Sequence, residues 1–247
     1  MSTTAKALQV LVLFRDGRTH LRAIDVMEAL DVSSATAYRY MADLEGIGLI
    51  ERSSINEYVL GPTIVELDRR IRESDPLIAA AKDVMKSLTE RTGGTALLCR
   101  LHGRKVVCVH QVRGRSGPVV SYERGKAMPL FLGATSKIIL AHMGVDVLRE
   151  IATSQAEELR KARLPVVFDE LSDAMTLLRA EKVCITHSEI DSGVRGFAAA
   201  IHQGRNLLGS LSIVLSDQIV LPNRKQVADQ VLRAALRIEG RLKPPGN

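Results

Sequence analysis

The chain has 247 residues and a formal net charge of +6, and this length suits a first domain of about 60–75 residues followed by a larger one. No apolar run is long enough to cross a bilayer. The first residues lead into an amphipathic segment rather than a signal-peptide core, so we expect a cytoplasmic protein with no membrane partner. Three cysteines is a low, odd number, which fits a reducing compartment better than a disulfide framework.

Apolar periodicity predicts two short amphipathic helices near the N-terminus, over residues 4–14 and 20–29. The positions expected to face inward are Ala7, Leu8, Leu11 and Phe14 in the first helix and Leu21, Ile24 and Met27 in the second. Residues 30–32 are expected to form a turn that leads into a third helix. This order of elements is typical of a helix-turn-helix.

The third predicted helix runs from about Ser33 to Leu44. Ser33 or Ser34 can cap it by accepting a hydrogen bond from an unpaired backbone N–H. Ala37, Met41 and Leu44 are spaced so that they share one buried face. The opposite face is therefore free to contact a partner.

That opposite face carries two small residues that permit close approach and two long ones that can reach bases or phosphates. They are Ala35, Tyr38, Arg39 and Ala42, while Tyr40 is expected nearer the core. A helix that enters the major groove of DNA needs such a face. The alternative is a three-helix packing unit with no nucleic-acid role.

Two short strand-like runs follow, over 46–52 and 53–61, and they resemble the wing of a winged helix. The sequence therefore predicts a winged helix-turn-helix domain over residues 1–61 that binds double-stranded DNA. The residues expected to contact DNA are Ser33, Ser34, Ala35, Thr36, Tyr38, Arg39 and Arg52.

The charge distribution does not support DNA binding by itself. Up to Ser74 the chain has nine basic and eleven acidic residues, which leaves 25 basic and 17 acidic residues in the remainder. A basic footprint is usual for a DNA-binding domain. We therefore expect modest affinity for each head, aided by dimerisation and strongly dependent on salt.

Residues 62–75 are expected to form a linker helix, because Pro62 stands at its start and Ile64, Leu67 and Ile71 recur at helical spacing. The body, residues 76–247, is predicted to contain helices over 77–91, 134–143, 145–152, 168–181 and 223–241. Its strands are expected over 95–101, 106–112, 118–122, 183–187, 194–203 and 207–215. Antiparallel strands flanked by helices give an α+β fold.

Several of these segments carry a family resemblance. In the head they are Thr36, Arg39, Met41, Leu44, Gly48 and Leu49. In the body they are Arg124-Gly125, Pro129-Leu130, Ala134, Ser136-Lys137, Ala141, Glu189, Gly193-Val194-Arg195, 198–201 and 210–212. In order and spacing the chain resembles the IclR family of bacterial transcriptional regulators over nearly its whole length. The resemblance implies a winged-helix head, a linker helix and a GAF-like effector-binding body, assembled as a dimer or tetramer on operator DNA.

The resemblance also implies an effector-binding site in the body. Its floor would be Gly133, Ala134 and Thr186, with Gly196 and Ser212 opposite, and Leu130, Phe131 and Val214 could supply apolar walls. The chain departs from the family at Gly196, where a cysteine is frequent, and at Ser136, where a glycine is usual. Gly196 is expected to widen the pocket or change the preferred ligand.

The predicted floor lies at the start of a helix, where free N–H groups and the positive end of the helix dipole favour a carboxylate. We therefore expect the effector to be a small organic acid or an aromatic catabolite. The alternative is that these are ordinary strand and cap residues.

Two enzymatic or metal-binding alternatives deserve a test against the spacing. Cys184 and His187 would point to opposite faces of a strand, which does not suit a nucleophile and its base. Cys99, His102, Cys108 and His110 lie on paired strands, so a metal site is conceivable, but the first two point to opposite faces and no CxxC spacing supports it. We expect no cofactor, no metal and no catalytic residue.

The sequence thus predicts a cytoplasmic, ligand-responsive transcription factor that controls a catabolic operon, with effector binding in the body shifting the placement of two heads. The alternative is a small-molecule sensor or enzyme that uses its winged-helix head for protein contacts.

Overall fold

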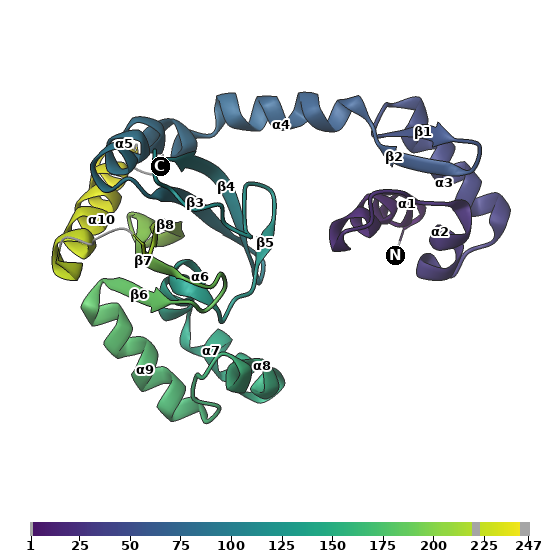
Figure 1. Ribbon diagram of the computed structural model, residues 1–247. Helices are drawn as coiled ribbons and strands as arrows, with labels where there is room; N and C mark the ends of the chain where they lie inside the picture. Colours follow the sequence, from purple (N-terminus) through teal and green to yellow (C-terminus); the bar gives the residue numbers. More distant parts are fainter. Residues whose placement is uncertain (1, 219–222, 243–247) are drawn as a thin grey trace. The chain divides into compact units, whose positions relative to one another are not determined.

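In the computed structural model the chain divides into two units, Met1–Asp75 and Pro76–Asn247, and residues 2–218 and 223–242 are described (Figure 1). The first unit contains α1 (Thr3–Val12), the 3-10 turn η1 (Leu13–Asp16), α2 (Ala23–Leu30), α3 (Ser34–Gly46), β1 (Ile50–Ser54), β2 (Glu57–Leu60) and α4 (Pro62–Ser74). The second contains α5 (Pro76–Thr92), β3 (Thr95–His102), β4 (Lys105–Arg113), β5 (Ala127–Met128), α6 (Gly133–Ala141), α7 (Val145–Ser154), α8 (Ala156–Lys161), α9 (Phe168–Glu181), β6 (Val183–His187), β7 (Val194–Gln203), β8 (Asn206–Ser216) and α10 (Arg224–Glu239).

The first unit packs its three N-terminal helices and the β1–β2 hairpin around one core. Val10, Val26, Met41 and Ile50 come from four different elements and are buried together. The hairpin is tied to the helices by a bridge in which the Leu21 N–H donates to the Tyr58 carbonyl and the Tyr58 N–H donates to the Leu21 carbonyl, both at 2.9 Å. The wing is therefore fixed to the helix-turn-helix by hydrogen bonds as well as by packing.

Two inward positions predicted in this unit are wrong. Leu8 is 50% exposed and Val10 is fully buried, because the apolar stripe of α1 is centred on Val10 rather than on Leu8. Ile24 is 44% exposed and Val26 is buried. The reason is that α2 begins at Ala23, three residues later than expected, since Leu21 is extended in its bridge to Tyr58.

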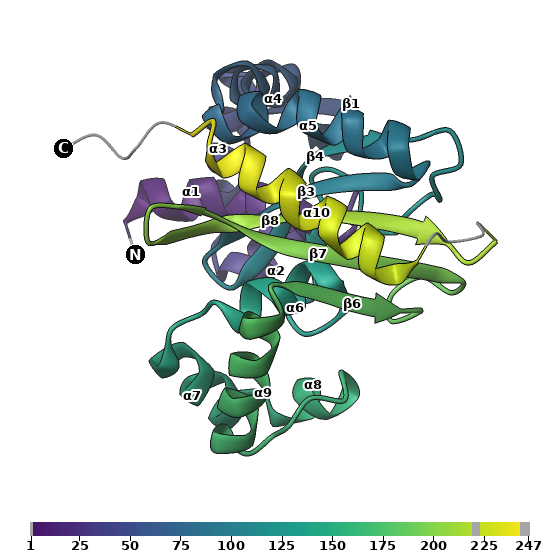
Figure 2. The same cartoon turned by 90° about the vertical axis from the view of Figure 1, so that its left-hand side faces the viewer.

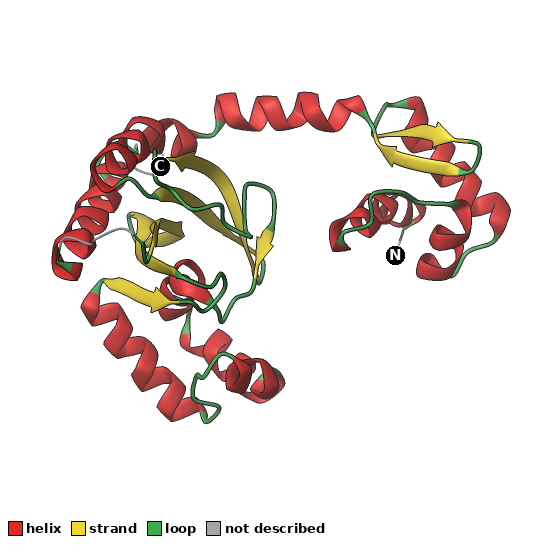
Figure 3. Cartoon of the chain, in the orientation of Figure 1, coloured by secondary structure: helices red, strands yellow, loops and turns green. Residues whose placement is uncertain are grey.

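The second unit is built on a six-stranded antiparallel sheet with the order β5-β4-β3-β8-β7-β6. Figure 3 shows its strands in yellow and the helices around them in red. Strand alternation sorts the side chains of the sheet onto its two faces. Phe197 and Ile213 on one face belong to the core formed with α5 and α10, and α10 crosses β7 and β8 in Figure 2. Ala198 and Val214, one position along, face the other side and pack with α6 and its neighbours.

The α+β class is confirmed, and most body elements lie within two or three residues of their predicted ends. The strand predicted over 118–122 is wrong: this segment is a loop in which the Pro118 carbonyl accepts the Thr95 hydroxyl and Val119 is 74% exposed. The edge of the sheet is instead the two-residue strand β5. Helix α8 was not predicted, because six residues are too few for a clear apolar period.

Among the described residues, no helix combines the length and the apolar character needed to cross a membrane.

Candidate functional site

Helix α3 begins with a side-chain cap. The Ser33 hydroxyl accepts the backbone N–H of Thr36 at 3.4 Å and lies 3.0 Å from the Thr36 hydroxyl. Of the two serines considered as caps, Ser33 is therefore the N-cap, and Ser34 is the first helical residue. The capped end fixes where α3 starts, and so which side chains share each of its faces.

The two faces of α3 differ as the periodicity predicted. Ala37, Tyr40, Met41 and Leu44 are buried. The opposite face is exposed and carries Ala35, Tyr38, Arg39 and Ala42, with Tyr38 half-exposed. Arg39 lies over the Tyr40 ring, with its guanidinium carbon 5.7 Å from the ring centre, while the rest of its surroundings are open. The first unit thus presents one exposed helical face on which Arg39 is the cation.

Arg52, on β1, is held within the unit. Its Nη2 donates to the Tyr58 hydroxyl at 2.7 Å, and its Nε lies 3.9 Å from a Glu45 carboxylate oxygen at the end of α3. These contacts join the wing to α3. Arg52 therefore positions the wing, with about half of its side chain left exposed for an outside contact.

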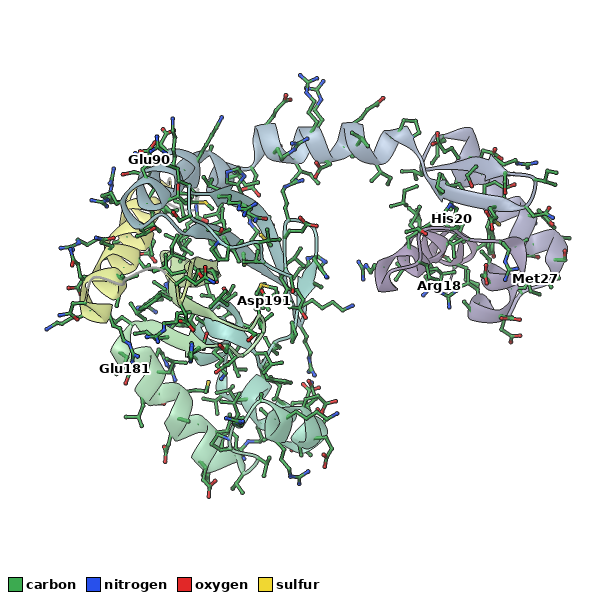
Figure 4. The ribbon with its side chains drawn as sticks, in the orientation of Figure 1. Arg18, His20, Met27, Glu90, Glu181 and Asp191 are labelled. Carbon is green, nitrogen blue, oxygen red and sulfur yellow. The ribbon has the colours of Figure 1, made fainter. Side chains whose placement is uncertain are left out.

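Other basic residues lie between the end of α1 and the start of α2, a segment in which Figure 4 labels Arg18 and His20. Arg15 and Arg18 are exposed, whereas Arg22 lies 3.5 Å from Asp25, whose carboxylate accepts the Arg22 backbone N–H at 2.8 Å. That bond closes the first turn of α2.

The second unit has a cavity of about 50 Å³ beside the start of α6. It is lined by Leu97, Val120, Tyr122, Met128, Gly133, Ala134, Thr135, Thr186, Ser188, Glu189, Ile190, Asp191, Val194, Gly196 and Val214. A water needs about 10–15 Å³ on this scale, so the cavity suits a compact ligand. The structure thus brings together Gly133, Ala134, Thr186, Gly196 and Val214, all named from the sequence.

Leu130, Phe131 and Ser212 do not line this cavity. Leu130 and Phe131 are buried in the core on that side of the sheet. Ser212 is fully buried and accepts the Thr135 hydroxyl at 2.9 Å, so it fastens α6 to β8. A neighbouring strand residue, Ser210, donates to the Thr135 carbonyl at 3.2 Å and strengthens the same junction.

The donors at the start of α6 are already in use, which corrects the expectation of free N–H groups there. The Gly133 N–H donates to Glu189 Oε2 at 2.9 Å, and the Ala134 N–H donates to the Thr186 hydroxyl at 3.1 Å. The other Glu189 oxygen lies 2.6 Å from Lys137 Nζ, one turn further along α6. A carboxylate of the chain itself thus occupies the place expected for the carboxylate of an effector.

Gly196 does not widen the cavity as expected. A Cβ at this position would lie 3.2 Å from the Thr186 hydroxyl and 3.3 Å from the Ala134 methyl. The space that a side chain would take is filled by these two residues. Gly196 instead lets the start of α6 approach β7 closely.

Most of the other lining residues were not predicted, and many of them come from loops, among them Val120, Tyr122 and 188–191. Asp191, in the loop between β6 and β7, accepts both the backbone N–H of Ser121, at 3.0 Å, and its hydroxyl. This joins the loop to the one before β5, and Asp191 is labelled in Figure 4. Among the described residues that line this cavity, Glu189 and Asp191 are the carboxylates, and none is a lysine or an arginine.

The cysteines do not form a reactive centre. Cys184 is 4% exposed, and its burial raises the pKa of its thiol to about 12, so the thiolate needed for attack is not available. His187 faces away and lies 2.6 Å from Asp217. Cys99 and Cys108 pair across β3 and β4, and no cluster of three metal-binding side chains occurs in the described part of the chain.

The two units together define a class of protein: a winged helix-turn-helix joined to an α+β unit with a small cavity. Family models agree with this description. That of the IclR helix-turn-helix domain matches residues 3–54, and that of the bacterial transcriptional regulator IclR C-terminal region matches residues 70–239. The chain belongs to the IclR family, and it is a transcriptional regulator rather than an enzyme.

Individual relatives match over nearly the whole chain. The HTH-type transcriptional regulator XynR of Escherichia coli is 25% identical over 97% of this chain and 98% of its own. An IclR homologue from Microbacterium hydrocarbonoxydans, solved with 4-hydroxybenzoate, has a TM-score of 0.78 and 21% identity, covering 97% of this chain and 98% of that one. An IclR-family regulator from Brucella abortus has a TM-score of 0.79 and 17% identity, and the match covers 98% of this chain and 93% of that one.

Proposed function

We propose that the protein recognises operator DNA through the exposed face of α3 and responds to a small effector in the cavity beside α6. In this proposal residues 1–61 are the DNA-binding domain, 62–75 the linker helix and 76–247 the effector-binding domain. The observation that carries it is the exposed row of Ala35, Tyr38, Arg39 and Ala42 on a capped helix. Small residues allow the helix to enter the major groove, and Arg39 supplies a donor pair suited to a guanine edge or a phosphate.

Ser33, Ser34, Ala35 and Thr36 form the N-terminal turn of α3, and this end of a recognition helix is the part that reaches base edges. Arg52 supports them from the wing, where its contacts to Tyr58 and Glu45 fix its position. Because the acidic residues of the first unit oppose DNA binding, pairing two heads on one operator supplies affinity that one head lacks.

Pairing has a surface available on α4. No residue of α4 is buried in its own unit, and Val65, Leu67 and Ile71 are all more than half exposed. Helical spacing places Leu67 and Ile71 on one face, which suits packing against α4 of a second copy in a dimer or tetramer.

The effector is a small aromatic or organic acid that controls a catabolic operon from the cytoplasm. Leu97, Val120, Met128 and Val214 give the cavity apolar walls suited to a ring, and a relative of the same fold is known with 4-hydroxybenzoate. Its carboxylate would replace Glu189 at the Gly133 N–H, which also frees Lys137 to act as counter-ion. An effector with unequal affinity for two arrangements of the heads then changes operator affinity.

The test is a mobility-shift titration of the full chain on the intergenic DNA beside its own gene, with and without 4-hydroxybenzoate and a panel of small carboxylates. We expect a sequence-specific shift that one of these acids changes by about five- to 150-fold. Failure to shift this DNA in preference to a scrambled duplex contradicts the DNA assignment. Calorimetry that detects no heat with any of these acids contradicts the effector assignment.

A further inference from the structure

A second hollow in the same unit lies against the loop that begins at Ser188. It has a volume of about 420 Å³ and is lined by Leu132, Lys137, Lys161, Ala162, Arg163, His187, Ser188 and Glu189. It shares Ser188 and Glu189 with the effector cavity but differs from it in character. Its lining is mostly polar and basic, whereas the effector cavity has apolar walls and two carboxylates.

The charge of this hollow is unbalanced. Lys137, Lys161 and Arg163 supply three cations, and Glu189 supplies the one carboxylate. Glu189 is paired with Lys137, whose side chain is only 12% exposed. Within the described residues no ion pair engages Lys161 or Arg163, and the nearby Asp217 is already held by His187 and Arg195.

The backbone at Arg163 is an independent sign of a site. Arg163 has a φ of +56° and directly follows the C-cap of α8. There the Arg163 N–H donates to Arg160 and the Leu164 N–H donates to Leu159, both at 2.9 Å, which is the Schellman motif. Glycine is the usual residue at this left-handed position, because it has no Cβ.

An arginine there costs stability that a glycine would not. Basic residues in the last turn of α8 offset the helix dipole, which accounts for Arg160 and Lys161 but not for Arg163. Four non-glycine residues of the described chain have positive φ, and two of them, Arg163 and Ser188, line this hollow. Strained backbone that persists beside a cluster of unpaired charge is typical of a binding site.

We propose that this hollow binds a small, doubly charged anion, either a phosphate monoester or a dicarboxylate, through Lys137, Lys161 and Arg163. The guanidinium of Arg163 offers paired donors to such a group, and the two lysines add point charges. Most of its lining is distinct from that of the effector cavity, and anion binding to it can be measured with no effector present.

The shared residue gives the second ligand a route to the first site. An anion in the hollow competes with Glu189 for Lys137, and the same Glu189 carboxylate accepts the Gly133 N–H at the effector cavity. This part of the inference rests on the proposed effector function. The effector acid and the anion would each displace Glu189. By linkage, each ligand therefore raises the affinity of the other by the same factor.

The test is calorimetry on the full chain at low ionic strength, with inorganic phosphate and succinate as separate probes. We expect one anion to bind per chain, and the probe that binds identifies the phosphate or the dicarboxylate class. Arg163→Gly should weaken binding at least about tenfold while leaving Tm unchanged or raised, because it removes the guanidinium and relieves the backbone. Loss of binding in this variant therefore cannot be ascribed to unfolding.

Two further variants complete the design. Lys86→Ala removes one exposed cation from α5, outside the hollow, and should bind as the wild type does. Val214→Phe fills the effector cavity and should also leave anion binding unchanged. The proposal is overturned if neither anion binds the wild type, if Arg163→Gly binds equally well, or if Val214→Phe abolishes binding. Failure of the effector acids alone leaves all of these results unaffected.

Discussion

The exposed face of α3 and the cavity beside α6 are built in different ways. One helix of 13 residues supplies the whole row from Ala35 to Ala42. The cavity instead draws on β3, the loop before β5, the start of α6 and the loop between β6 and β7. A surface on one helix keeps its geometry while that helix is folded, whereas a cavity changes whenever one of its walls moves. Substitutions on the exposed face of α3 should therefore alter DNA recognition alone, and substitutions around the cavity should alter effector binding and stability together.

The largest expected effect is that of Arg39→Ala. Loss of one bidentate contact is worth about 1–3 kcal/mol per head, so a two-headed assembly should lose about 2–6 kcal/mol of operator affinity. The fold should be unchanged, because the Arg39 side chain is exposed. Fluorescence anisotropy with a labelled operator measures the affinity, and circular dichroism checks the fold.

Arg70→Ala is the matched control for this change. It removes the same charge from the same unit, at a side chain that is 81% exposed on α4. It should weaken binding slightly and equally on specific and scrambled DNA. Equal losses for the two variants would show that Arg39 contributes only general charge, which sinks the assignment of α3 as the reading helix.

Val214→Phe sharpens the other side of the comparison. The larger ring should fill the cavity and lower effector affinity at least about tenfold, at a stability cost of about 1–3 kcal/mol from overpacking. Operator binding without effector should persist. Val119→Phe, at a 74% exposed loop position, should leave the response intact. A normal ligand response in Val214→Phe would place the effector elsewhere.

Glu189→Gln tests whether the Glu189 carboxylate competes with an acidic effector for the start of α6. The variant keeps an acceptor for the Gly133 N–H but loses the ion pair to the largely buried Lys137, so we expect a loss of about 1–3 kcal/mol of stability. An acidic effector should bind it more tightly, because the competing charge is gone. Denaturant unfolding and calorimetry measure the two effects.

The control for this variant is Glu150→Gln, which breaks an exposed pair with Arg104. Exposed pairs contribute little, so its unfolding midpoint should not move. If Glu189→Gln is as stable as this control, the ion pair between Lys137 and Glu189 does not stabilise the fold.

The smallest expected effect concerns pH. Burial, with the neighbouring His202, lowers the pKa of His142 from 6.5 to about 4. The folded protein therefore holds His142 neutral where the unfolded chain would protonate it, so this stabilisation is complete above pH 6.5 and is lost as pH falls toward 4. In the wild type the ring centres of His142 and His202 are 4.7 Å apart, and His142→Phe keeps a ring at this contact. The variant should lose about 1–2 kcal/mol less unfolding free energy than the wild type as the pH falls. An unchanged slope of unfolding free energy against pH would contradict this assignment.

The contrast also explains what the sequence could and could not predict. The cap at Ser33 and the buried set around Met41 follow from local spacing, and both are found as expected. Glu189 was visible only as part of a family motif, because its contact with Gly133 spans 56 residues and no periodicity encodes it. Asp191 and Ser121 likewise meet across 70 residues of sequence. The misplaced α2 start has the same origin, since the Leu21–Tyr58 bridge outweighed the local helical signal.

Tyr58 has a further consequence for how the first unit meets its target. It joins the β2 backbone to Leu21, and its hydroxyl receives the Arg52 side chain, which also approaches Glu45 at the end of α3. The wing and α3 are therefore braced through one residue and have little freedom to adjust to each other. When such a rigid head binds, adaptation falls on the duplex, so sequences whose grooves already have the right width are favoured even at base pairs that no side chain touches.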